Sequence, residues 1–182
     1  MKIFGIDPGS ERTGYGCIES DGSRHRLVVC GAISSPAAMP FAEKLFTIHT
    51  RLADLLGSCH PDCVALESLF FAANVRSALK LGHARGVAML AAVEARLPVF
   101  EYTPAEIKRA VVGYGRAEKH QIQQMVKLML GLPAPPSPHD AADALAVAIC
   151  HMNSRLPAGL ATPTAVRGKA ATSWRHYRPA RS

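Results

Sequence analysis

Four acidic residues at the ends of apolar segments place the strongest constraint on this chain. Asp7 closes the first apolar run of the sequence, and Glu67 closes a later one. Asp140 and Asp143 sit together in an alanine-rich apolar stretch. Carboxylates beside apolar runs tend to be partly buried, which is costly unless a positive charge compensates them. Magnesium or manganese ions, which carboxylate oxygens bind, are the usual compensation.

Each acid also has an ordinary structural explanation when it is taken alone. Asp7 precedes a Pro-Gly pair and suits a turn, and Glu67 could simply leave a strand for solvent. Asp140 could complement the N-terminus of a helix, whereas the apolar residues after Asp143 make that acid harder to explain. Two ions held by shared carboxylates can activate water and stabilise a leaving oxygen. The four acids together therefore favour metal-dependent phosphodiester cleavage.

Apolar periodicity and turn residues predict an α/β fold. The expected strands are residues 2–7, 13–18, 25–33, 63–67 and 99–102, and the expected helices are residues 41–56, 75–96, 117–130 and 137–152, with a further helix starting at Thr103-Pro104. Gly57 is expected to end the first helix. This order predicts a mixed sheet, an antiparallel meander followed by parallel strands, flanked by helices.

The predicted sheet places the acids relative to one another. Asp7 and Glu67 lie at the carboxyl ends of strands, where sites form in such sheets, provided that the first and fourth strands are neighbours. A spacing of three residues puts Asp140 and Asp143 on one face of the last helix. All four carboxylates can then meet at one edge of the sheet.

Charge is distributed unevenly along the 182 residues. Five of the 21 Lys and Arg residues fall in residues 157–182, which contain no acid, so the rest of the chain is nearly balanced against its 14 acids. We expect residues 1–156 to form one domain and residues 157–182 to be a basic, disordered tail. Such a tail suits a polyanion such as DNA or RNA, or serves only solubility.

Other features of the sequence predict a cytoplasmic protein. No apolar run is long enough for a membrane span, and the first residues lack the features of a signal peptide. The five cysteines are scattered and odd in number, so we expect free thiols in a reducing compartment rather than disulfides or a zinc site.

Three motifs resemble the RuvC family of Holliday junction resolvases, which have the ribonuclease H-like fold. The motifs are Gly5-Ile6-Asp7-Pro8-Gly9, residues 77–88 and residues 140–146, and the match covers roughly residues 1 to 155. The resemblance implies a homodimeric endonuclease of homologous recombination and DNA repair. It would nick two opposing strands of a four-way junction and leave 5′-phosphate and 3′-hydroxyl ends.

The resemblance also implies roles for particular residues and partners. Asp7, Glu67, Asp140 and Asp143 form the implied catalytic set, with two Mg²⁺ ions per site and Mn²⁺ as a substitute. Some relatives carry His at the third acidic position, so His139 competes with Asp140 for that role. We favour Asp140 because of its spacing to Asp143. A branch-migration motor of the RuvA and RuvB type is the implied partner.

Candidate DNA contacts follow from the same resemblance and from charge. Phe70 matches a position that wedges between bases, and Phe71 is adjacent, although both could instead pack against the next helix. Lys108 and Lys119 match basic contact positions of the family. Weaker candidates for phosphate contacts are Arg76, Lys80 and Arg116.

Small residues recur every four positions in the second predicted helix, at Ala78, Gly82 and Gly86. Glycine inside a helix costs about 1 kcal/mol relative to alanine, so the stripe indicates close approach of another backbone. That backbone is either the sheet beneath or the same helix of a second subunit, and the resemblance favours the dimer.

Three other functions are worth separating from junction resolution. A sister ribonuclease H-like nuclease would act on another branched or RNA-containing substrate. A nucleic-acid-binding module would keep the fold without activity, which the four acids argue against. A phosphotransferase of the sugar-kinase and actin type needs a second lobe, for which 182 residues leave no room.

Overall fold

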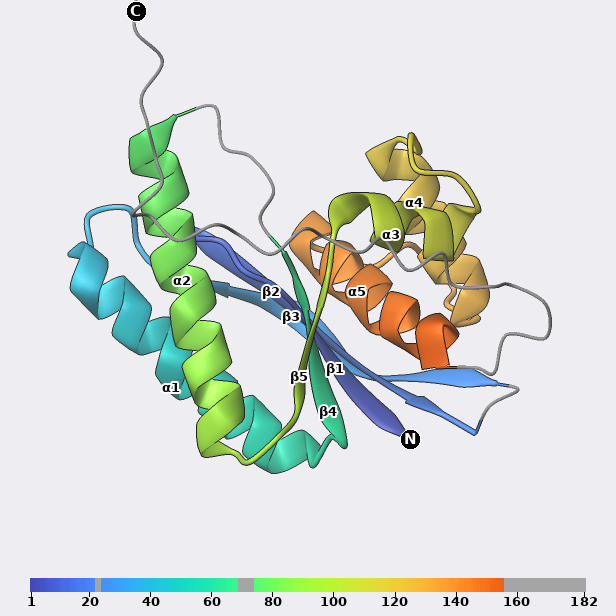
Figure 1. Cartoon of the computed structure of the whole chain (residues 1–182), viewed down its shortest axis with the longest axis horizontal. Coiled ribbons are helices and arrows are strands. Elements are labelled where there is room, and N and C mark those ends of the chain that lie inside the picture. The colour runs from blue at the N-terminus through green and yellow to red at the C-terminus, as the bar shows by residue number, and fades with distance from the viewer. Residues whose placement is uncertain (22–23, 69–73, 156–182) are drawn as a thin grey trace, which may run out of the picture.

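The computed structural model describes residues 1–21, 24–68 and 74–155, and its centre is a five-stranded sheet with the order β3-β2-β1-β4-β5 (Figure 1). The strands are β1 (Lys2–Asp7), β2 (Arg12–Ser20), β3 (His25–Ser34), β4 (Cys63–Glu67) and β5 (Val99–Tyr102). The helices are α1 (Phe41–Cys59), α2 (Val75–Glu94), α3 (Pro104–Val112), α4 (Lys119–Met129) and α5 (His139–Arg155). β1 to β3 form an antiparallel meander, and β4 and β5 run parallel to β1. The predicted mixed sheet is confirmed.

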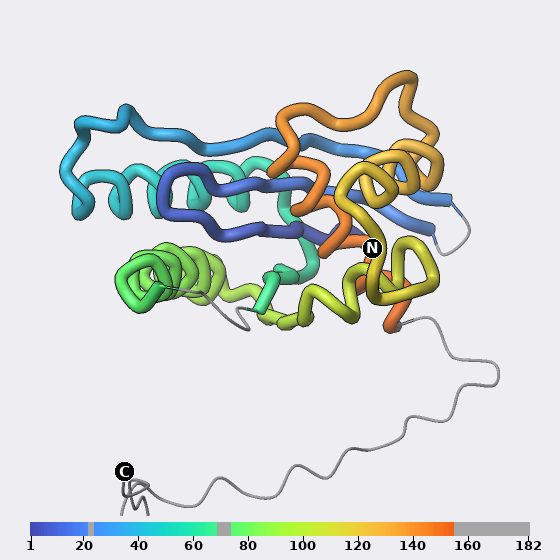
Figure 2. Tube along the Cα trace, turned by 90° about the horizontal axis from the view of Figure 1, so that it is seen from above, coloured from blue at the N-terminus to red at the C-terminus, as the bar shows by residue number. Residues whose placement is uncertain are grey.

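Helices cover both faces of the sheet (Figure 1). Helices α1 and α2 lie on one face and α3, α4 and α5 on the other, a division that Figure 2 shows from above. Strand residues alternate between the two cores, because successive side chains point to opposite faces. In β1, Ile3 packs in the core beneath α5, whereas Phe4 and Ile6 pack in the core beneath α1 and α2.

Helix α5 lies unusually close to the sheet because glycine provides the space. A Cβ atom built on Gly5 would stand 2.0 Å from the carbonyl oxygen of Ala144, and one built on Gly14 would stand 2.0 Å from that of Asp140. Any side chain at these two positions would push the helix away. The helix itself is almost entirely buried from Ala144 to Cys150. The two glycines thus set the height of α5 above β1 and β2.

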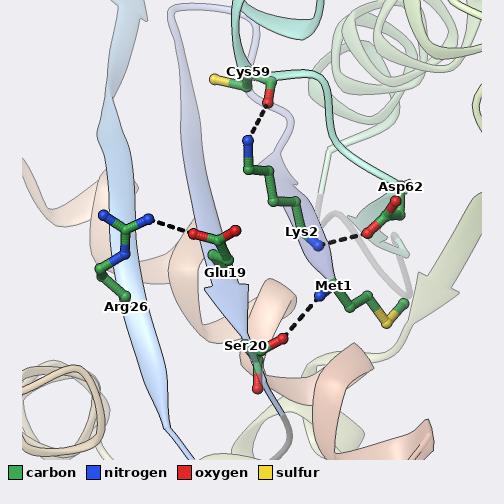
Figure 3. Close-up of polar contacts among 7 residues, drawn as sticks. All are labelled: Met1, Lys2, Glu19, Ser20, Arg26, Cys59 and Asp62. Carbon is green, nitrogen blue, oxygen red and sulfur yellow. Dashed lines mark hydrogen bonds and ion pairs between the residues drawn. The ribbon is translucent and has the colours of Figure 1, made fainter.

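The amino end of β1 is fixed by polar contacts, which Figure 3 shows. The N-terminal ammonium group donates to the carbonyl oxygen of Ser20 at 2.8 Å. The backbone N–H of Lys2 donates to Asp62 at 2.7 Å, and its Nζ donates to the carbonyl oxygen of Cys59 at 3.3 Å. These bonds join β1 to β2 and to the segment before β4, so the neighbouring strands are held in register at the end opposite Asp7.

The prediction that Gly57 ends the first helix is wrong. Helix α1 continues through Gly57 to Cys59, and His60 closes it in the left-handed conformation with φ of 47°. Cys59 is buried against the core, so packing holds the last turn in place despite the glycine. Other boundaries differ by a few residues from those expected. All five cysteines are free thiols, as expected, and within the described ranges no helix is long and apolar enough to cross a membrane.

Candidate active site

Asp7 and Glu67 end two neighbouring strands. β1 and β4 pair in parallel, and Ile6 lies opposite Leu66. The residues that follow them, Asp7 and Glu67, are therefore neighbours at the ends of the two strands. Because Ile6 and Leu66 face α1 and α2, alternation turns both carboxylates toward the face that carries α5. The expected adjacency of the first and fourth strands is confirmed.

Helix α5 brings the other two acids over the same edge. Gly14 pairs with Asp7 across β1 and β2, and the backbone of Asp140 lies directly against Gly14. Asp143 follows one turn later, on the side of the helix that faces Glu67 and α4. Three separate segments of the chain therefore meet at this point of the fold.

The acids raise one another's pKa values. The pKa of Asp7 is raised from 3.8 to about 7, mainly by burial and then by the charges of Glu67, Asp143 and Asp140 in that order. Burial also raises the pKa of Glu67, with a further contribution from Asp143, while a hydrogen bond from Asp7 opposes the change. The edge thus holds more negative charge than it can solvate, which is a setting for a cation.

A pocket of about 200 Å³ opens beside these acids. Its polar lining combines Glu67 and Asp143 with Lys108 and Lys119, and its apolar lining comprises Pro104, Ile107, Ile122 and Ala146. Lys108 comes from α3, which Thr103 and Glu106 start with a reciprocal capping box. Lys119 opens α4, and its Nζ lies 2.7 Å from Asp143. That hydrogen bond is the main reason why the pKa of Lys119 is raised.

Asp140 and its neighbour His139 point to different partners. The ring of His139 contacts the side-chain amide of Gln123 in α4. Asp140 instead lies 3.4 Å from the guanidinium of Arg12, at the start of β2. Arg12 was not among the residues predicted from sequence. The strand pattern could have indicated it, because Arg12 and Gly14 are two residues apart in β2 and therefore point to the same face of the sheet. That face carries α5, and Arg12 lies just beyond the end of β1.

In the described ranges, no three His, Cys, Asp or Glu side chains are grouped so that they could hold a metal ion. Two of the acids form ion pairs instead, Asp140 with Arg12 and Asp143 with Lys119. The donor set nevertheless suits a hard divalent cation, because it consists of four carboxylates whose charges disfavour each other. The four side chains are thus of the type that binds such an ion, although Asp140 and Asp143 form ion pairs with basic residues in this structure.

The remaining predicted DNA contacts have different surroundings. Arg76 and Lys80 are exposed on α2, and Arg116 is exposed between α3 and α4. The Nζ atom of Lys80 lies 5.7 Å above the ring of Phe41. The segment that contains Phe70 and Phe71 lies outside the described residues.

The small-residue stripe of α2 faces away from the sheet. The residues that α2 buries are Ala84, Ala88, Ala91 and Ala92, whereas Gly82 and Gly86 have no atom within 4 Å of an added Cβ. Approach to the sheet beneath is therefore excluded as the reason for these glycines. They line an open groove of about 500 Å³ together with Ala78, Leu45, Leu79, His83, Val87 and Leu90. Leu79 and Leu90 are 60% and 51% exposed, so the groove is an unusually apolar surface.

Comparison with known proteins identifies the family. Residues 3–151 match the sequence profile described as crossover junction endodeoxyribonuclease RuvC. The chain is 52% identical to the RuvC of Trichlorobacter lovleyi over 182 residues, which cover 98% of this chain and all of that protein. It is 51% identical to the RuvC of Ruminiclostridium cellulolyticum over 154 residues, which cover 85% and 93% of the two chains.

Solved structures agree with this assignment. A structure of Thermus thermophilus RuvC in complex with a Holliday junction substrate has a TM-score of 0.78 and 34% identity, covering 84% of this chain and 94% of that one. A second Thermus thermophilus RuvC structure has a TM-score of 0.77 and 36% identity over the same shares. The fold is thus the ribonuclease H-like α/β fold that was expected. This chain belongs to the RuvC family of crossover junction endodeoxyribonucleases.

Proposed function

We propose that this protein is a metal-dependent endonuclease that resolves four-way DNA junctions through paired nicks in opposing strands. The observation that carries the proposal is the meeting of Asp7, Glu67, Asp140 and Asp143 at one sheet edge, beside a pocket that also contains two lysines. The relative from Thermus thermophilus is described in complex with a Holliday junction, which supports the same substrate here. The products are 5′-phosphate and 3′-hydroxyl ends, formed in homologous recombination and DNA repair.

RuvC nucleases depend on metal ions, and the four acids are the proposed ligands in this chain. We assign two Mg²⁺ ions to the site, with Mn²⁺ as a substitute, because carboxylate oxygens are the ligands that both prefer. When bound, such ions activate water and stabilise the leaving oxygen. The chain's own contribution is to gather the carboxylates at one point, where burial and the charges of Glu67 and Asp143 raise the pKa of Asp7 to about 7.

Lysines beside the acids provide the first contacts to the DNA backbone. Lys108 and Lys119 border the same pocket as Glu67 and Asp143, so a phosphate that approaches the acids passes both ammonium groups. Arg76, Lys80 and Arg116 are exposed and free to contact phosphates further along the arms. A role for Phe70 and Phe71 at the opened junction centre stays a prediction from the family resemblance.

A homodimer would place two such sites on one junction. The groove around Gly82 and Gly86 accepts another helix at close range, and a second α2 carries the same small residues and the same exposed leucines. An isologous contact of this kind gives twofold symmetry, which matches two nicks in opposing strands. A motor of the RuvA and RuvB type, and a division into residues 1–156 and 157–182, remain predictions from sequence.

Cleavage of synthetic junctions tests the function directly. Fixed and mobile four-way junctions, labelled on each strand in turn, should yield symmetric nicks in Mg²⁺ and none in EDTA. Linear duplex and an RNA–DNA hybrid serve as comparison substrates. Preference for the hybrid, or for another branched substrate, would favour a sister ribonuclease H-like nuclease instead.

A further inference from the structure

Arg12 opens β2 directly after a turn that the rest of the fold holds firmly. The hydroxyl of Thr13 donates to the carbonyl oxygen of Gly9 at 2.8 Å, which closes the turn between β1 and β2. Glu11 forms a 2.7 Å ion pair with Lys44 of α1, whose side chain is only 5% exposed. Contacts of the two flanking residues, Glu11 and Thr13, therefore fix the backbone position of Arg12.

The ion pair between Arg12 and Asp140 is half open to solvent. The guanidinium lies 3.4 Å from the carboxylate, and the two side chains are 54% and 26% exposed. Lys119 and Asp143 repeat the arrangement, with side-chain exposures of 58% and 20%. In each pair the cation is the more accessible partner, so a phosphate from solution can approach the cation from its exposed side.

A guanidinium binds carboxylate and phosphate through the same planar fork of N–H donors. Arg12 cannot serve both partners fully with one such fork. A DNA phosphate near the acids would therefore compete with Asp140 for Arg12. Loss of Arg12 would leave Asp140 as an unpaired carboxylate beside Asp7, which favours a divalent cation there.

We propose that Arg12 is a positioning residue that holds Asp140 in the DNA-free protein and transfers to a DNA phosphate when the junction binds. Junction binding and metal binding then assist each other, because each removes a competitor of the other. The inference rests on the proposed function, since it takes the four acids as metal ligands and junction DNA as the source of phosphate.

The first experiment measures junction binding in EDTA, where no cleavage occurs. Asp140→Asn releases Arg12 and should tighten binding about three- to fivefold, the range expected for an exposed ion pair. In an Arg12→Gln background the same substitution should change binding less than about twofold. A simple loss of negative charge would instead give the same gain in both backgrounds, and that result would overturn the proposal.

The second experiment measures Mn²⁺ affinity of the DNA-free protein from the electron paramagnetic resonance signal of free Mn²⁺. Arg12→Gln should tighten Mn²⁺ binding about three- to fivefold, and Arg12→Lys should do so less, because it keeps a charge beside Asp140. Lys108→Gln is the matched control, since Lys108 is also a cation near the acids, in the pocket with Glu67 and Asp143, but forms no ion pair among the described residues. Equal effects of Arg12→Gln and Lys108→Gln would contradict a specific role for Arg12.

The two experiments separate this inference from the proposed function. Thermal unfolding of each variant establishes that it is folded before its affinities are compared. Absence of junction binding by the wild-type protein would contradict the proposed function and the transfer of Arg12 to DNA, and the Mn²⁺ measurement would still decide whether Arg12 holds Asp140.

Discussion

Asp7 and Glu67 end adjacent parallel strands, where burial raises the pKa of both carboxyl groups and the charge of Glu67 raises that of Asp7 further. Two acids placed together on the partly buried edge of a sheet destabilise the fold whenever both are ionised. Their position therefore costs stability, as expected of the metal ligands proposed above.

Replacement of Asp7 should stabilise the metal-free protein. Its folded-state pKa of about 7 exceeds its ordinary value of 3.8, so its contribution to stability is complete below pH 3.8 and is lost as the pH rises through about 7. Asp7→Asn removes this loss and should raise the free energy of unfolding in EDTA by up to about 4 kcal/mol at pH 8. The gain should disappear near pH 4. Denaturant unfolding at both pH values measures it, and Asp54→Asn, at an exposed position of α1, is the control.

Asp143→Asn should separate cleavage from binding. A proposed direct metal ligand is lost, so cleavage should fall by more than the roughly 100-fold that supporting residues of metal sites cost. Junction binding in EDTA should persist, because Lys119 keeps its charge and loses its intramolecular partner. Single-turnover cleavage and gel-shift assays measure the two effects. Loss of binding as well would mean that Asp143 serves the structure rather than the chemistry.

Gly82→Leu should break self-association without unfolding the monomer. A Cβ atom added at Gly82 meets no atom within 4 Å and points into an open groove, so we expect the isolated fold to accommodate leucine there, while a helix packed in the groove does not. Gly57→Leu is a matched control, because Gly57 is also helical and open but lies on α1 away from the groove. Both variants should gain helix propensity, by less than about 1 kcal/mol. Sedimentation should find a monomer only for Gly82→Leu, and a dimeric Gly82→Leu would place the interface elsewhere.

Removal of residues 156–182 should weaken junction binding at moderate salt and leave cleavage in place. The deletion removes five basic residues and no acid. Each basic residue that contacts a phosphate contributes about 0.9 to the slope of log affinity against log salt concentration, so the slope should decrease by at most about 4.5. Binding isotherms at several salt concentrations give the slope. An unchanged slope would show that these residues do not contact DNA.

Local patterns in the sequence predicted the strand end or helix face of each acid, whereas their meeting also required the first and fourth strands to be neighbours, which the structure shows. Alternation in the first and fourth strands, together with the spacing from Asp140 to Asp143, defines faces that hardly depend on the rest of the fold. The end of α1 was predicted wrongly because a glycine signal was weighed without the packing of Cys59. Local signals set preferences, and burial decides between them.

Features that depend on pairing across the chain were not accessible in this way. Arg12 contacts an acid 128 residues later, which requires the height of α5 above β2 to be known. Whether the glycines of α2 face the sheet or solvent depends on how that helix is rotated about its axis. The rotation is known only from the structure, which buries the alanines on the opposite side of the helix. The dimer was expected only from the family resemblance, whereas the open apolar groove on α2 gives a physical reason to expect one.

The contact between Gly5 and the carbonyl oxygen of Ala144 has a consequence for genetic screens. A methyl group at that point would lift one end of α5 and carry two distant aspartates with it, although the altered residue has no reactive group. Such a lesion would be scored among catalytic mutants. In this protein the spacing between backbone layers is as much a part of the enzyme as the carboxylates themselves.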